Sequence, residues 1–135
     1  MSLIQVPVSY GELIDKLTIL EIKSARISAP AKLANVRKEL ELLDGTWRRD
    51  PAAATDISDL WRQLRTVNER LWVVEDDLRI LEKAQRFDAE FVRLARSVYF
   101  ENDERARVKR EINLRLGSTL VEEKSYQDYG SRKPV

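Results

Sequence analysis

The 135-residue sequence contains neither cysteine nor histidine. Their absence excludes disulfide bonds, zinc sites with the usual thiolate and imidazole ligands, thiol nucleophiles and histidine general bases. Any chemistry must therefore use carboxylates, lysine, arginine, tyrosine, serine or a hard cation such as magnesium. The lack of cysteine also fits a reducing cytosol, so we expect a cytoplasmic location.

Glycine and proline are scarce, with four of each, and none lies between Pro51 and Gly117. Such a long span without a strong helix breaker predicts long helices. No stretch approaches the roughly 18 consecutive apolar residues of a membrane span, and the first residues do not resemble a signal peptide. The net charge is only +1, so no overall attraction to nucleic acid or to an anionic membrane is expected.

What the sequence does contain is ample apolar material, 43% of residues, beside an unusually large charged fraction of 35%. We expect residues 1–135 to form a single all-α domain, an antiparallel helical hairpin or bundle of about four to five helices with coiled-coil-like packing. Segment 118–135 is expected to be a partly flexible, solvated tail. The alternative is that Tyr126 or Tyr129 covers a pocket.

The first helix is indicated by Ser9 and Glu12, which have the spacing of a capping box. In that motif the glutamate carboxylate bonds back to the backbone of the capping residue, and Asp15, one turn later, would be solvated. A second helix is expected to begin with a cap at Ser28 and to end at Gly45.

The third helix has the strongest periodic signal, because its apolar residues alternate spacings of three and four over more than three heptads. These residues are Ile57, Leu60, Leu64, Val67, Leu71, Val74, Leu78 and Leu81. The second helix has similar spacing, so we expect the two to form an antiparallel hairpin covered by the first helix. Breaks are expected near residues 86–88, with Asp88 as a cap, and at Asn102, and Gly117 should end the last helix.

Two polar strips on predicted helix faces form the candidate ligand site. At about 100° per residue around the helix axis, the residues of the first strip fall within an arc of about 60° and those of the second within about 80°. The first consists of Asn68, Trp72, Glu75 and Arg79, with Asp76 beside it, and the second consists of Asn102, Arg105, Lys109 and Asn113. Arginine offers a fork and lysine a point charge to phosphate or carboxylate, so the second strip predicts anion binding.

Each strip also has an interpretation without a ligand. Glu75 and Arg79 have the spacing of a surface ion pair, and Asn102 is a suitable helix cap. Arg105 and Lys109 would then form a solvated basic face. Under the ligand hypothesis, replacing Arg79 or Lys109 with alanine should impair binding at little cost in stability, because both lie off the apolar seams.

The chain contains VPVSYGELIDK at residues 6–16, LWxxEDxxR at 71–79, LARSVYxxNDxRxxxKxxIN at 94–113 and EEKSY at 122–126. In these segments, over nearly its full length, it resembles a bacterial family of small helical proteins known only as a domain of unknown function. A second uncharacterised helical family is similar in pairing an LWxxEDxxR segment with a later segment rich in Asn, Asp, Arg and Lys. The resemblance implies a setting beside glycosyltransferases of surface-polysaccharide synthesis, and it implies no catalytic residues.

Three functions fit these features. The first, which we prefer, is a binding or accessory module that recognises an anionic small molecule, such as a phosphorylated compound or a nucleotide sugar. The second is a magnesium-dependent all-α nucleoside phosphate pyrophosphohydrolase, in which Glu12 and Asp15 would face Glu75 and Asp76 across the metal, although the chain departs from the metal-binding pattern of that class. The third is a coiled-coil module that forms a homodimer or binds a partner. The sequence identifies no cofactor.

Overall fold

The computed structural model describes residues 2–130, which form four α-helices, one short 3₁₀ helix and no strand. These elements are α1 (Tyr10–Arg26), α2 (Pro30–Arg49), η1 (Pro51–Ala54), α3 (Ser58–Lys83) and α4 (Ala89–Leu116). The expected all-α helical bundle is therefore confirmed.

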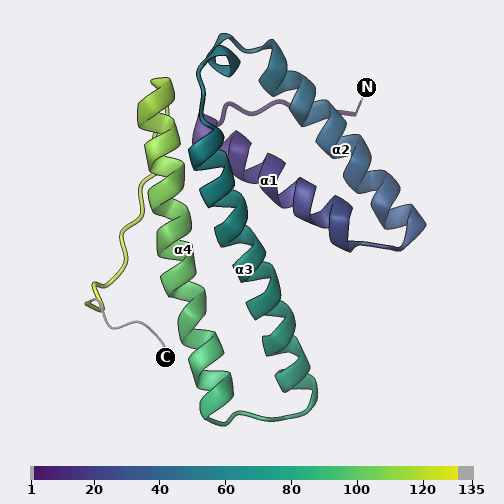
Figure 1. Ribbon diagram of the computed structural model, residues 1–135, viewed down its shortest axis with the longest axis vertical. Helices are drawn as coiled ribbons and strands as arrows, with labels where there is room; N and C mark the ends of the chain where they lie inside the picture. The colour runs from purple at the N-terminus through teal and green to yellow at the C-terminus, as the bar shows by residue number, and fades with distance from the viewer. Residues whose placement is uncertain (1, 131–135) are drawn as a thin grey trace.

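Two helix pairs make up the fold (Figure 1). Helices α3 and α4 lie side by side as a long antiparallel hairpin, and their far halves extend beyond the other pair. Helix α1 packs against both α3 and α4 and carries α2 on its other side. After α4 the chain turns back and runs along that helix. Helix α1 thus contacts each of the other three α-helices, as its broad apolar surface requires.

The predicted pairing of the second and third helices is wrong. Helix α2 packs mainly on α1 and η1, whereas α3 packs along α4. The reason is that α4 has its own apolar seam, which includes Phe91, Leu94, Val108 and Ile112, and it is longer than α2. The seam of α3 therefore finds a longer partner in α4 than α2 could provide.

The hydrophobic core lies where α1 crosses the α3–α4 hairpin. Its buried members are at most 8% exposed and come from all four α-helices and from Ile57, which precedes α3. They are Leu13, Ile14, Leu17, Trp47, Ile57, Leu60, Leu64, Val108 and Ile112. Trp47 of α2 closes one end of the core, with its ring 6.4 Å from that of Tyr10 and 6.2 Å from that of Trp61.

Two predicted helix boundaries are confirmed. Asp88 caps α4 by accepting a hydrogen bond from the Phe91 N–H at 3.4 Å. Gly117 ends α4 in the left-handed conformation, with φ of 65°, which glycine adopts without strain.

Three other boundaries are wrong. Helix α2 starts after Ala29 instead of Ser28, and it continues through Gly45 to Arg49 because packing of the Trp47 turn outweighs the weak helix preference of one glycine. The helix ends where Pro51 starts η1. Helix α4 runs through Asn102 without a break, so this residue is no helix cap.

The close crossing of α1 and α4 depends on Gly11. Its backbone N–H donates to Asn113 Oδ1 at 2.6 Å. A Cβ atom at this position would lie only 2.4 Å from the carbonyl oxygen of Lys109, which is backbone and cannot rotate away. The two helices can therefore keep their hydrogen bond only if residue 11 has no side chain.

We predict that Gly11→Ala lowers the free energy of unfolding by about 2–3 kcal/mol, because α1 must shift away from α4 to relieve the overlap. Urea denaturation followed by circular dichroism measures the change. Gly45→Ala is the matched control, since a Cβ there would meet only the flexible end of Arg49 at 3.0 Å. In the middle of α2 that change should raise the free energy of unfolding by about 0.5–1 kcal/mol. Equal effects of the two changes would contradict the close-crossing explanation.

Candidate functional site

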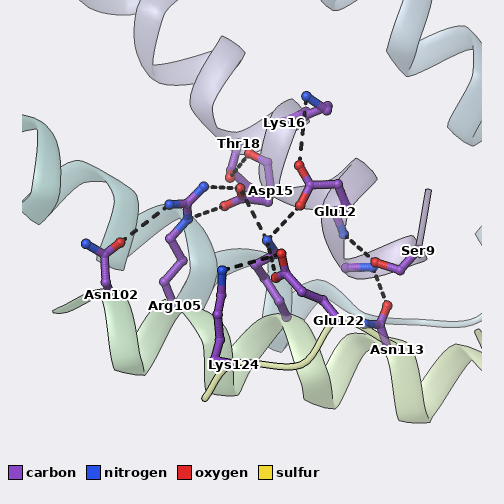
Figure 2. Close-up of polar contacts among 12 residues, drawn as sticks. Ser9, Glu12, Asp15, Lys16, Thr18, Asn102, Arg105, Asn113, Glu122 and Lys124 are labelled. Carbon is purple, nitrogen blue, oxygen red and sulfur yellow. Dashed lines mark hydrogen bonds and ion pairs between the residues drawn. The ribbon is translucent and has the colours of Figure 1, made fainter. Parts of the chain in front are cut away.

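The most deeply buried charged residue in residues 2–130 is Asp15, which is 0% exposed. Figure 2 shows its carboxylate facing the Arg105 side chain. Arg105 of α4 donates hydrogen bonds to both oxygens of the Asp15 carboxylate, from Nε to Oδ1 at 2.9 Å and from Nη2 to Oδ2. Asn68 of α3 donates Nδ2 to the same Oδ1 at 2.9 Å and to Thr18 Oγ1 at 3.0 Å. One carboxylate thus joins three helices, and the expectation that Asp15 is solvated is wrong.

Lys109 forms a second ionic contact beside this pair. Its Nζ donates to Glu12 Oε2 at 2.7 Å and to Glu122 Oε1 at 3.1 Å, and it lies 4.0 Å from Asp15 Oδ2. Burial of the ammonium group works against its charged form, but the hydrogen bond that Lys109 donates to Glu12 and the charge of Asp15 outweigh burial and raise the pKa of Lys109. This side chain is 8% exposed. Replacing it at little cost in stability, as the sequence suggested, is therefore not expected.

The capping box at the start of α1 is only half formed. Ser9 Oγ accepts a hydrogen bond from the Glu12 N–H at 3.1 Å, as predicted. The Glu12 carboxylate turns instead to Lys109, because a buried ammonium group carries a full charge and costs more to leave without a partner than a neutral backbone N–H does.

The proposed magnesium site is not assembled by these carboxylates. Glu12 and Asp15 are paired with cations of α4. Glu75 and Asp76 face a different cleft. Within residues 2–130 there is no group of three acidic side chains arranged to hold a metal ion.

Seven of the nine predicted ligand residues line one cleft of about 510 Å³ between α1, α3 and α4, which we term the Trp72 cleft. They are Asn68, Trp72, Glu75, Asp76 and Arg79 from α3, and Asn102 and Arg105 from α4. Helix α1 contributes Ile19, Ile22 and Lys23 to the same cleft. The first strip therefore lines the same cleft as Asn102 and Arg105 of the second strip, although the two strips lie far apart in sequence.

The remaining two predicted residues lie outside the Trp72 cleft. Asn113 accepts the hydrogen bond from Gly11, and Lys109 is held between Glu12 and Glu122. Both side chains are used in attaching α1 and the C-terminal segment to α4.

The floor of the Trp72 cleft presents a fixed hydrogen-bond acceptor. A carboxylate can only accept hydrogen bonds, so the Nδ2 group of Asn68 must point at Asp15. The amide oxygen of Asn68, Oδ1, therefore points the other way. In residues 2–130 this oxygen has no hydrogen-bond partner, and no buried side-chain polar atom is unpaired. The Asn68 oxygen therefore reaches the surface of the cleft that the residue lines.

The rim of the cleft carries charges of both signs on exposed side chains. Arg79 donates to Glu75 at 2.7 Å, but these side chains are 73% and 46% exposed, so the pair contributes little to stability. Lys23, Asp76 and the indole N–H of Trp72 form no ion pair or hydrogen bond within the described part of the chain. The cleft thus combines Asn68, which is held in place by Asp15, with charged side chains at the rim that can reorient toward a ligand.

A second cleft, of about 930 Å³, lies between α4 and segment 118–130, and we term it the tail cleft. It shares Asn102 and Arg105 with the Trp72 cleft, so the two clefts border on the same side chains. Tyr126 and Tyr129 line the tail cleft, in agreement with the alternative in which one of them covers a pocket.

Segment 118–130 is attached to the helices at several points. Ser118 Oγ accepts a hydrogen bond from the Tyr10 N–H at 3.3 Å, near the start of α1. Glu122 bonds to Lys109, and the Tyr129 hydroxyl donates to Asp103, which raises the pKa of Tyr129 to about 12. The first part of the predicted tail is therefore laid along α4, and residues 131–135 lie outside the described part.

One protein family matches residues 4–134, nearly the whole chain. The chain belongs to this family of unknown function, DUF6165. Comparison with curated proteins and with solved structures finds no match. Membership of DUF6165 therefore agrees with the likeness seen in the sequence and assigns no activity. No helix in residues 2–130 is long and apolar enough to cross a lipid bilayer.

Several residues that build the site were not among the predicted ones. Gly11, Asp15, Thr18 and Ile22 follow one another at spacings of four, three and four, so they share one face of α1. That face combines a glycine, a carboxylate and a hydroxyl, which is the composition expected where helices approach closely and exchange polar contacts. The signal was present in the sequence, but the larger apolar residues beside it dominate the pattern.

We predict that Asp15→Asn lowers the free energy of unfolding by about 2–3 kcal/mol. The substitution replaces one accepting oxygen with an NH₂ group, which then faces a hydrogen-bond donor of Arg105 or Asn68. It also leaves Arg105 without its counter-charge. Glu75→Gln is the control, because it removes one carboxylate from an exposed pair and should change stability by less than about 0.5 kcal/mol. Urea denaturation of both variants makes the comparison, and a small loss for Asp15→Asn would show that the buried pair is not what holds α1 in place.

Proposed function

We propose that this protein is a small helical binding module whose Trp72 cleft holds an anionic small molecule. The observation that carries the proposal is the convergence of seven of the nine predicted ligand residues, from two distant segments, around one cleft. The hydrogen bond from Asn68 to the buried Asp15 carboxylate also supports the proposal. A charged surface that only contacts solvent does not require an asparagine held in one orientation. The anchored floor keeps polar groups in position before a ligand arrives, which lowers the entropic cost of binding.

The composition of the cleft favours a ligand that has both a ring and an anionic group. Ile19, Ile22 and Trp72 offer apolar surface and an aromatic face. Lys23 and Arg79 lie at the rim as cations for phosphate or carboxylate.

The amides of the cleft serve neutral polar groups of the ligand. Asn68 offers an acceptor to hydroxyls or base edges. Asn102 Oδ1 lies 3.5 Å from Arg105 Nη1, so its NH₂ group is turned away from that cation and can donate. A nucleotide sugar combines a ring, phosphates and hydroxyls, and it fits the polysaccharide setting that the resemblance implies.

Isothermal titration with UDP-glucose, GDP-mannose and a CMP-linked sugar tests the proposal. At least one should bind, and Arg79→Ala should weaken its binding about tenfold, the effect of losing one charge-assisted hydrogen bond. Trp72→Ala should weaken binding at least as much, because the ring face is lost.

Arg70→Ala is the matched control for Arg79→Ala. Arg70 lies on the same helix, is 60% exposed and does not line the Trp72 cleft, so its replacement should leave affinity unchanged. Absence of heat with every nucleotide sugar would overturn the proposal. So would an equal loss of affinity in the Arg70 and Arg79 variants, because attraction would then be a property of overall charge.

A further inference from the structure

The ion cluster at the centre of the molecule has one carboxylate more than its two α4 cations require. Arg105 and Lys109 face Glu12, Asp15 and Glu122. Arg105 with Asp15 and Lys109 with Glu12 already form two one-to-one pairs, each joining α1 to α4. Glu122, from the segment after α4, is the third carboxylate, and both Arg105 and Lys109 remain paired without it.

Glu122 is also the most accessible of the three carboxylates. Its side chain is 40% exposed, compared with 30% for Glu12 and 1% for Asp15. The other cation near it, Lys124, lies 3.5 Å away on the same segment and would move with it. Loss of the Glu122 contact therefore breaks no bond between helices, while it frees a donor on a Lys109 ammonium that has three.

The Glu122 carboxylate lines the tail cleft, which adjoins the Trp72 cleft. Lys109 and Glu122 line the tail cleft, which meets the Trp72 cleft at Asn102 and Arg105. Lys109 and Arg105 stand on either side of the Asp15 carboxylate. An anion that replaced Glu122 would therefore lie close to a ligand seated in the Trp72 cleft.

We infer that Glu122 fills an anion subsite on Lys109, and that a phosphate group of a ligand takes this place when segment 118–130 moves away from α4. The inference rests on the proposed function in identifying the ligand as phosphorylated, and it adds that the segment and the ligand compete. Lys109 lowers the pKa of Glu122 through their hydrogen bond, so the glutamate is a charged competitor at neutral pH. Beyond Ser118, the other polar attachments of the segment, through Glu123 to Arg110 and Tyr129 to Asp103, are exposed. The Tyr129 ring also packs against Tyr99 and Phe100, with ring centroids 5.1 and 4.7 Å apart.

Inorganic pyrophosphate is the probe, used with the full chain and with Glu122→Gln in isothermal titration. The glutamine keeps the shape of the side chain and removes its charge, so Glu122→Gln should bind pyrophosphate roughly fivefold more tightly, as expected for loss of one charge-assisted contact to the competitor. Glu123→Gln is the matched control, because its partner Arg110 is exposed and lines neither cleft. It should bind like the unaltered chain.

A second readout follows the segment itself. Tryptic cleavage after Lys124, measured by mass spectrometry against cleavage after Lys38 in α2, should become several-fold faster when pyrophosphate is added to the unaltered chain. In Glu122→Gln the cleavage should be fast without pyrophosphate. Both results together support competition between the segment and the anion.

Three results would overturn the inference: equal or weaker binding of pyrophosphate by Glu122→Gln, a cleavage rate that pyrophosphate does not change, or no binding by either protein. If the nucleotide sugars still bind in a manner sensitive to Arg79, only the competition by Glu122 fails. If no nucleotide sugar binds but Glu122→Gln shows the expected gain, the Lys109 subsite stands and the proposed function fails.

Discussion

The arrangement of the helices depends on the need to compensate one buried carboxylate. Asp15 is withdrawn from water, and an isolated charge in such a place would be very costly. Arg105 supplies the counter-charge and Asn68 supplies a further hydrogen bond, so the crossing of α1 over the α3–α4 hairpin is fixed by directional contacts. The Trp72 cleft lies next to this crossing, and its shape follows from the same contacts. Apolar packing alone would hold the helices together without specifying this position so closely.

Local pattern predicted α3 well and α4 poorly, for one physical reason. The apolar seam of α3 is unbroken, whereas the same spacing in α4 runs from Val98 through Glu101 and Arg105 to Val108. A break was expected at Asn102 because asparagine is a suitable helix cap, and the charged residues that interrupt the seam gave no sign that the helix continues. The partner that makes Arg105 acceptable there is 90 residues away in α1, and no local pattern contains that information.

The candidate site divides in the same way. Helical spacing grouped each polar strip on one face of its own helix, but it could not show that the two strips meet. That the first strip lines the same cleft as Asn102 and Arg105 follows from the packing of α3 along α4. It could not show that Asn113 and Lys109 are already engaged by Gly11, Glu12 and Glu122, since these partners come from both ends of the chain. One face of α4 therefore has two uses. Its C-terminal half attaches other segments, and its middle borders the clefts.

This division bears on the choice between binding and hydrolysis. Metal-assisted hydrolysis of a phosphate needs several carboxylates that converge and remain available to a cation. Here Glu12 and Asp15 each neutralise a cation of α4, and freeing them would undo the contacts that place α1. The side chains that can change partners at little cost are Arg79 at the rim and Glu122 of the C-terminal segment. Groups of that kind exchange one ionic partner for another, which is what a protein that takes up and releases an anion requires.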